Sequence, residues 1–143
     1  MRGMNGRFFL DTNVFVYSFD HQAPKKAQLA GQLIRKAATT RKGIISYQVV
    51  QEFFNVALRR FAQPMTGPEA EQYLATVFRP LLAVHSSQAL YGEALRLSGR
   101  YQLHWHDSLI VAAAMQGQCS VLFSEDLQHG QRFEDLQVLN PFS

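Results

Sequence analysis

The sequence has a single cysteine, Cys119, among its 143 residues. One thiol can form neither an internal disulfide nor a thiolate zinc site, so both kinds of support for the fold are excluded. Cys119 lies just before the apolar run 121–123, and this position predicts a buried and unreactive thiol. The absence of disulfides is consistent with a reducing cytoplasm, where we expect the protein to act.

Long apolar runs are also absent. The longest uncharged apolar run, residues 109–115, is far shorter than the roughly 20 residues that cross a membrane. The apolar stretch near the N-terminus ends at Asp11, so it does not resemble the core of a signal peptide. The sequence therefore predicts a soluble protein without a membrane partner.

Acidic residues are few, with 11 Asp and Glu against 14 Lys and Arg, and the net charge is +3. This weak basic excess is compatible with a polyanionic partner but does not require one. The sequence also lacks the glycine-rich motifs of NTPases and dinucleotide-binding proteins, and the Gly-X-Ser-X-Gly motif of esterases. These three classes of function have no support.

What the sequence does contain is typical of a folded domain, since 47% of its residues are hydrophobic and 12% are aromatic. No repeat, linker or low-complexity tract interrupts the chain, and we expect residues 1–143 to form a single domain. Short apolar runs alternate with longer segments of helical spacing, which predicts an α/β fold with a mostly parallel sheet.

The expected strands are residues 7–10, 43–46, 81–85, 121–123 and 137–139. The expected helices are residues 14–19, 24–37, 47–61, a helix that starts after Thr66, 87–97, 106–116 and a short helix between the last two strands. Thr66 and Glu69 have the spacing of a capping box, and Pro24 suits the first turn of a helix.

Four of the 11 acids occupy positions that are unusual for solvated surface charges. Asp11 follows the first strand directly, and Asp126 lies three residues after the fourth. Glu52 lies among apolar residues of the helix after the second strand, and Asp107 begins an apolar helix. In parallel sheets, ligands bind beyond the carboxyl ends of the strands, so these acids could meet in one cleft.

Clustered carboxylates repel one another unless a cation neutralises them. Oxygen ligands favour Mg²⁺ or Mn²⁺, and such an ion can activate water against a phosphodiester. Simpler interpretations stay open at this point. Asp11 and Asp107 could cap helices, Asp126 could belong to a turn, and Glu52 could be solvated or paired with a basic residue.

Four segments of the sequence resemble the signature motifs of PIN-domain ribonucleases, and in particular the VapC-type toxins of bacterial toxin–antitoxin pairs. The segments are residues 9–13 (FLDTN), 50–53 (VQEF), 105–110 (WHDSLI) and 122–130 (LFSEDLQHG). The resemblance extends from about residue 8 to residue 142. It implies a PIN-like fold, in which a central, mostly parallel sheet of four to five strands is flanked by helices.

The resemblance also implies roles for individual residues. Asp11, Glu52, Asp107 and Asp126 match the family's four acidic positions, which bind Mg²⁺ or Mn²⁺ and activate the water that cuts RNA. The small polar positions that support the acids are matched by two further residues, Asn13 and Ser124. The implied partners are an RNA substrate such as tRNA or rRNA, a VapB-like antitoxin and a second copy of the chain.

Two other functions remain as alternatives. The same fold could process RNA outside a toxin–antitoxin pair, or it could bind RNA or protein without catalysis. The His104-Trp105-His106 segment could supply zinc ligands, but no second His or Cys cluster supports this interpretation. Trp105 could pack in the interior or stack on a base, and the basic residues could be solvated or line an RNA path; these are Lys25, Lys26, Arg35, Lys36, Arg41, Lys42, Arg59 and Arg60.

Overall fold

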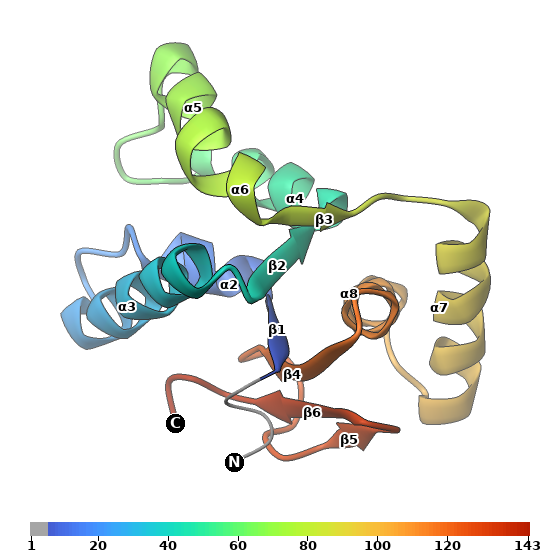
Figure 1. The fold of residues 1–143 in the computed structure, drawn as a ribbon. Helices are drawn as coiled ribbons and strands as arrows, with labels where there is room; N and C mark the ends of the chain where they lie inside the picture. Colours follow the sequence, from blue (N-terminus) through green and yellow to red (C-terminus); the bar gives the residue numbers. More distant parts are fainter. Residues whose placement is uncertain (1–5) are drawn as a thin grey trace.

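The computed structural model describes residues 6–143, which form one six-stranded sheet in the order β3-β2-β1-β4-β6-β5 (Figure 1). The strands are β1 (Arg7–Leu10), β2 (Gly43–Ser46), β3 (Leu82–Val84), β4 (Cys119–Phe123), β5 (Arg132–Phe133) and β6 (Leu136–Leu139). All neighbouring strands are parallel except β5 and β6. The prediction of an α/β fold with a mostly parallel sheet is confirmed.

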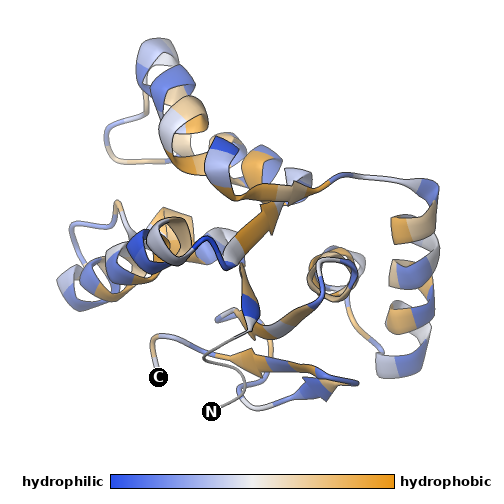
Figure 2. Ribbon diagram, in the orientation of Figure 1, coloured by the Kyte–Doolittle hydropathy of each residue, from blue (hydrophilic) through white to orange (hydrophobic). Residues whose placement is uncertain are grey.

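Helices cover both faces of this sheet. They are α2 (Thr12–Tyr17), α3 (Pro24–Thr40), α4 (Tyr47–Ala57), α5 (Gly67–Tyr73), the π-helix η1 (Leu74–Phe78), α6 (Arg79–Leu81), α7 (Gln88–Tyr101) and α8 (Trp105–Gln116). In Figure 1, α3 lies on one side of the sheet and α7 and α8 lie on the other. Hydrophobic residues concentrate on the central strands, while hydrophilic residues mark the outer turns of α3 and α7 (Figure 2).

The first strand of the chain is also a central strand of the sheet. β1 pairs with β2 on one side and with β4 on the other. Phe8, Phe9 and Leu10 are all buried. A strand that is covered on both faces is continuously apolar, which is why this short segment could be predicted as a strand.

Aromatic rings fix the orientation of α4. Phe53 is fully buried, and its ring stacks on that of Tyr73 with centroids 5.0 Å apart. The ring of Phe53 also contacts those of Phe19 and Phe78. Because Phe53 follows Glu52 in the sequence, this packing also determines the direction in which Glu52 leaves the helix.

The structure corrects two of the predicted helices. The helix expected over residues 47–61 ends at Ala57, and the backbone N–H of Met65 bonds to the Ala57 carbonyl after a turn. Phe61 still packs on the core from this turn, and its burial produces the misleading helical spacing. No helix lies between β4 and β6, where turns and the two-residue β5 are found instead.

The structure bears on the expected burial of Cys119 and on the expected lack of a membrane-spanning segment. Cys119 is buried, as predicted, and burial raises the pKa of its thiol to about 12. Among the helices of residues 6–143, none has both the length and the apolar character needed to cross a membrane.

Candidate active site

Asp11 occupies the point where β1 ends and α2 begins. Its backbone N–H bonds to the Phe123 carbonyl of β4 at 3.0 Å, so the carboxyl ends of the two strands lie together. Its side chain is 4% exposed. Oδ1 accepts a bond of 2.7 Å from the Thr12 N–H, and Oδ2 accepts one of 2.7 Å from the Ser124 hydroxyl. Asp11 therefore caps α2, but it also belongs to a larger polar site.

Asp126 is connected to Asp11 through Ser124. The Asp126 N–H donates to the Ser124 Oγ at 3.2 Å, while the same hydroxyl donates to Asp11. The two acids follow β4 and β1, which are neighbours in the sheet. Residues far apart in the chain meet here because both strands end at the same edge.

Glu52 approaches this edge from α4 and has three polar contacts. The Thr12 hydroxyl donates to its Oε1 at 2.6 Å, and the Gln48 amide donates to its Oε2 at 2.8 Å. The His106 Nε2 lies 2.5 Å from Oε2. The contact with Thr12 ties Glu52 to the residue directly after Asp11.

Asp107 reaches the same region from the first turn of α8. The Gln48 amide also donates to the His106 carbonyl at 3.1 Å, which joins α4 to the start of α8. Partial burial raises the pKa of Asp107, and the nearby charges of Asp126 and Glu52 raise it further. The histidines beside it, His104 and His106, act in the opposite direction.

The strongest electrostatic perturbation is at Asp11. Burial raises the pKa of this carboxyl to about 7, although the bonds from Ser124 and Thr12 oppose the rise. The charges of Asp126 and Glu52 add to it. The charges of Asp126 and Glu52 thus act on both Asp11 and Asp107, and we name these four residues the acidic cluster. Among residues 6–143, no Lys or Arg side chain forms an ion pair with this cluster.

The donor chemistry of the acidic cluster fits a hard divalent cation, because all four side chains offer carboxylate oxygen. Within the described part of the chain, however, no three His, Cys, Asp or Glu side chains are grouped closely enough to hold a metal ion. A cation at this edge would therefore need water among its ligands. Mg²⁺ typically keeps several waters and takes only one or two carboxylates.

The two residues expected to support the acids differ in their contacts. Ser124 is fully buried and contacts both Asp11 and Asp126. The amide Nδ2 and Oδ1 atoms of Asn13 are buried and have no hydrogen-bond partner among residues 6–143. The structure therefore connects Ser124 to the acids and does not connect Asn13 to them.

Sequence reasoning missed the residues that hold Glu52. The sequence gives Thr12 no role beyond its place in a motif, and it offers His106 only as the start of a helix or a zinc ligand. Gln48 could have been found, since residues four apart lie on the same face of a helix. The contact between His106 and Glu52 has no such pattern, because it depends on how α4 and α8 pack.

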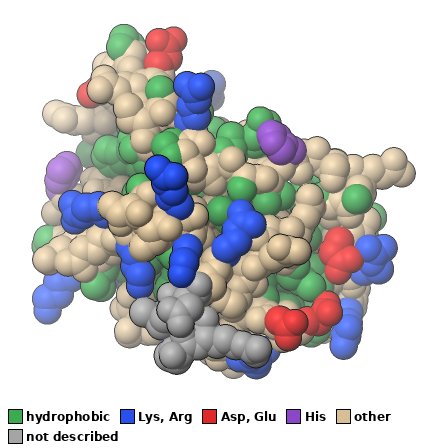
Figure 3. Space-filling model, viewed as in Figure 1, with side chains coloured by type: hydrophobic (Ala, Val, Ile, Leu, Met, Phe, Trp, Pro, Cys, Tyr) green, Lys and Arg blue, Asp and Glu red, His purple; other side chains and the backbone are tan. Residues whose placement is uncertain are grey.

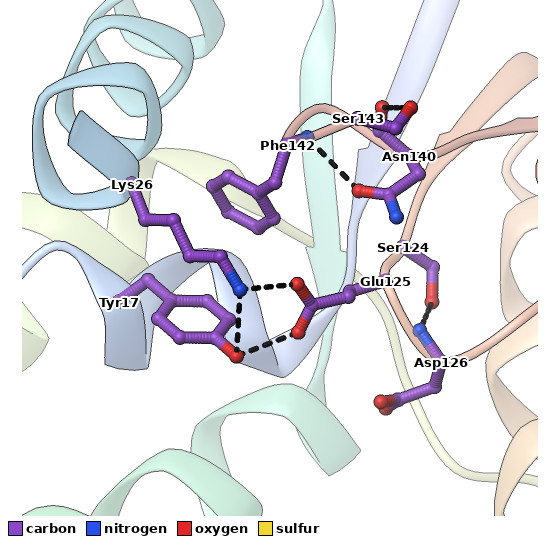
Figure 4. Close-up of polar contacts among 8 residues, drawn as sticks. All are labelled: Tyr17, Lys26, Ser124, Glu125, Asp126, Asn140, Phe142 and Ser143. Carbon is purple, nitrogen blue, oxygen red and sulfur yellow. Dashed lines mark hydrogen bonds and ion pairs between the residues drawn. The ribbon is translucent and has the colours of Figure 1, made fainter. Parts of the chain in front are cut away.

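Sequence reasoning also missed a second charged cluster, beside Asp126. The Lys26 Nζ lies 2.7 Å from the Glu125 Oε2, and the Tyr17 hydroxyl donates to the Glu125 Oε1 at 2.6 Å (Figure 4). The ammonium also faces the rings of Tyr17 and Phe142. We name Tyr17, Lys26 and Glu125 the lysine clamp. Lys26 is therefore engaged within the protein, whereas Figure 3 shows other Lys and Arg side chains exposed over α3.

A family model for the PIN domain matches residues 8–134. The chain belongs to the PIN domain family. The match spans all four members of the acidic cluster. No curated protein sequence matches the chain.

Solved structures share the PIN fold of this chain at low sequence identity. A toxin–antitoxin complex from Klebsiella pneumoniae is 18% identical, with a TM-score of 0.67, over 93% of this chain and 96% of that one. VapC20 from Mycobacterium tuberculosis, a toxin that cleaves the sarcin–ricin loop, is 18% identical with a TM-score of 0.57, over 83% and 91%. FitAcB from Neisseria gonorrhoeae is 16% identical with a TM-score of 0.61, over 94% and 98%.

Proposed function

We propose that this PIN domain is a metal-dependent endoribonuclease that hydrolyses RNA phosphodiester bonds, and that it acts as a VapC-like toxin. The observation that carries the proposal is the acidic cluster. Asp11 and Asp126 follow β1 and β4, and Glu52 and Asp107 lie on α4 and α8. The charges of Asp126 and Glu52 act on the other two carboxylates, and Asp11 is buried. An uncompensated carboxylate is costly to bury, so the cluster calls for a cation.

Asp11, Asp107 and Asp126 are the residues that would hold Mg²⁺ or Mn²⁺, directly or through water, with Glu52 as a further ligand or a neighbour of the ligands. The bound ion supplies a polarised water and positive charge for the phosphate oxygen. Carboxylates that lie close together repel one another. A bound cation would therefore stabilise this cluster more than it would stabilise an isolated carboxylate.

The chain's own residues orient the acids. The Ser124 hydroxyl and the Thr12 N–H fix both oxygens of Asp11. The Thr12 hydroxyl and the Gln48 amide fix Glu52, so its carboxylate is positioned to orient the attacking water. Preorganised carboxylates need not rearrange during the reaction, which lowers its barrier.

An antitoxin partner is part of the proposal. The solved structures of similar fold include toxin–antitoxin complexes from Klebsiella pneumoniae and Rickettsia felis. A basic antitoxin side chain, such as arginine, could neutralise the acidic cluster in place of the metal. We also propose a homodimer and a cytoplasmic site of action, as the VapC resemblance implies.

Cleavage of total cellular RNA by the purified protein tests the nuclease. We expect discrete products with Mg²⁺ or Mn²⁺, none with EDTA, and none from Asp11→Asn. Asp135→Asn is the matched control, because Asp135 is an exposed residue outside the acidic cluster. Metal-dependent cleavage that survives in Asp11→Asn would contradict the proposed role of the cluster.

The toxin role needs a separate test in cells. Expression of the chain should arrest growth, and the Asp11→Asn chain should not. Co-expression of a small DNA-binding protein encoded beside it should restore growth. RNA cleavage in vitro without growth arrest would instead favour a role in RNA processing.

A further inference from the structure

A small hollow lies beside the acidic cluster, at the carboxyl ends of β2 and β3. Its volume is about 70 Å³. Ser46 and Gln48 line it from β2 and α4, and Leu90 and Tyr91 line it from α7. The proposed mechanism uses Gln48 to hold Glu52 but uses nothing else in this hollow.

Ser46 is the first unusual feature of the hollow. Its side chain is 2% exposed, and its Oγ has no hydrogen-bond partner among residues 6–143. A serine at the start of a helix commonly accepts a bond from the helix backbone, but Ser46 does not cap α4 in this way. A buried hydroxyl without a partner is unfavourable, so a ligand that hydrogen-bonds to it would gain affinity.

Exposed aromatic rings are the second unusual feature. Tyr91 is 44% exposed and Trp105 is 43% exposed, and their ring centroids lie 6.2 Å apart. Tyr91 lines the hollow, while Trp105 begins α8, two residues before Asp107. Large aromatic side chains usually bury most of their surface, so two exposed neighbours beside an acidic cluster indicate a binding surface.

The hollow is joined directly to the catalytic side chains. Gln48 lines it and donates to both Glu52 and the His106 carbonyl. A ligand in the hollow would therefore lie next to the residues that orient the water. This proximity favours a part of the substrate itself as the occupant.

We propose that the hollow is a subsite for one unpaired nucleobase of the RNA, next to the bond that is cut. The base stacks on Tyr91, with Trp105 extending the aromatic surface, and its polar edge meets the Ser46 hydroxyl. A volume of about 70 Å³ admits the edge of a base but not the whole ring, which leaves the face for the exposed aromatics. The inference rests on the proposed nuclease function and assigns to named residues the contact with the base beside the cut bond.

The chemistry of the hollow distinguishes a base from other occupants. Proteins read single-stranded RNA by stacking bases on aromatic rings and hydrogen-bonding their edges. A hydroxyl, a carboxamide and aromatic rings supply both kinds of contact. A base inside a duplex presents neither its face nor its full edge, so double-stranded RNA would not fit.

Binding to short fluorescent RNA oligonucleotides tests the subsite without cleavage, if all variants are made in an Asp126→Asn background. Tyr91→Ala should weaken binding of single strands roughly 5- to 50-fold, because a stacking contact is lost. Tyr91→Phe should restore it. Ser46→Ala should change the order of preference among oligo-A, -C, -G and -U, and duplex RNA should bind weakly to every protein.

Leu95→Ala is the matched control, since Leu95 is a 62% exposed residue of the same helix and does not line the hollow. It should bind as the parent does. In cleaving protein, Tyr91→Ala should raise KM and leave kcat nearly unchanged, because stacking acts equally in the ground and transition states. A higher KM with an unchanged kcat would distinguish the loss of a substrate contact from a loss of structure.

Three results would overturn the subsite. Tyr91→Ala could bind and cleave as Leu95→Ala does, while the unmodified protein cleaves RNA; the subsite would then be wrong and the nuclease right. Tyr91→Ala could bind RNA normally but lose the antitoxin, which would assign the surface to a protein partner. If the unmodified protein neither cleaves RNA nor binds single strands, the proposed nuclease function itself fails.

Discussion

Glu125 and Asp126 are adjacent in the sequence, but their carboxylates differ in the charged partners that surround them. Glu125 belongs to the lysine clamp, where bonds from Lys26 and Tyr17 lower the pKa of its carboxyl even though burial acts against them. Figure 4 draws no contact between the Asp126 side chain and this clamp, and the one bond drawn to Asp126 joins its N–H to Ser124. Among residues 6–143, Asp126 has no Lys or Arg partner.

Asp11 shows the same difference between the lysine clamp and the acidic cluster in a buried position. Asp11 is as deeply buried as the core residues around it, and the carboxylates of Asp126 and Glu52 raise the pKa of its side chain further. Within residues 6–143, Lys26 neutralises Glu125, whereas no Lys or Arg side chain forms an ion pair with Asp11 or Asp126. The lysine clamp is thus paired within the fold, and the acidic cluster is where we propose that the metal binds.

The largest expected effect is on the rate of RNA cleavage, which should respond very differently to substitution of Asp126 and of Glu125. Asp126→Asn should lower the rate of RNA cleavage at least about 100-fold, because a proposed metal ligand is lost. Glu125→Gln should change it less than about fivefold, since the clamp only supports the loop. Initial rates with Mn²⁺ measure both, and equal losses would show that the two acids are not functionally distinct.

The second prediction concerns stability and pH at Asp11. The unfolded carboxyl ionises near its ordinary pKa of 3.8 and the folded one near 7, so a rise in pH between these values destabilises the folded state. Each pKa unit corresponds to about 1.4 kcal/mol. Asp11→Asn removes this penalty and, at pH 8 without metal, should be more stable than the unmodified protein by on the order of 4 kcal/mol.

Urea unfolding in EDTA at pH 4, 6 and 8 measures this difference. The gap between the two proteins should be small at pH 4 and should widen as the pH rises. Asp135→Asn, which alters an exposed carboxyl, should follow the unmodified protein at every pH. A constant gap would mean that Asp11 is not the group that titrates.

The third prediction is that metal should stabilise only proteins with an intact acidic cluster. At 10 to 100 times its Kd, Mn²⁺ should stabilise the folded state by about 1.4–2.7 kcal/mol. Thermal unfolding with and without Mn²⁺ should show this gain in the unmodified protein and in Glu125→Gln. The gain should disappear in Asp126→Asn, and an undiminished gain there would place the metal elsewhere.

The smallest effect should come from the lysine clamp. Lys26→Met should lower the unfolding temperature by roughly 2–4 °C at low salt, because the ion pair with Glu125 is partly exposed. The loss should shrink at 0.5 M salt, which screens exposed charges. Lys25→Met replaces an exposed lysine of the same helix and should have no such effect.

The fold could be predicted where burial leaves a simple pattern. β1 is apolar throughout because both of its faces are covered, and Thr66 and Glu69 form the capping box that their spacing predicts. The end of α4 could not be predicted, because Phe61 is buried from a turn. β5 has only two residues, too few to show any alternation.

The site could be predicted only in part, for a related reason. The four acids follow strands or begin helices, so their positions in the sequence already suggest one edge of the sheet. Their partners could not be found in this way. Glu125 is 99 residues from Lys26, and nothing in either local sequence indicates that they meet. Such pairs are set by how whole elements pack, which a single sequence does not reveal.

The position of β1 also determines when the site can exist. Asp11 and Ser124 are separated by 113 residues, and the bond between them requires β4 to be in place beside β1. A chain that is still being synthesised carries Asp11, Glu52 and Asp107 before that strand has been made. The acidic cluster therefore cannot assemble until β4 and the segment after it, up to Asp126, have been synthesised.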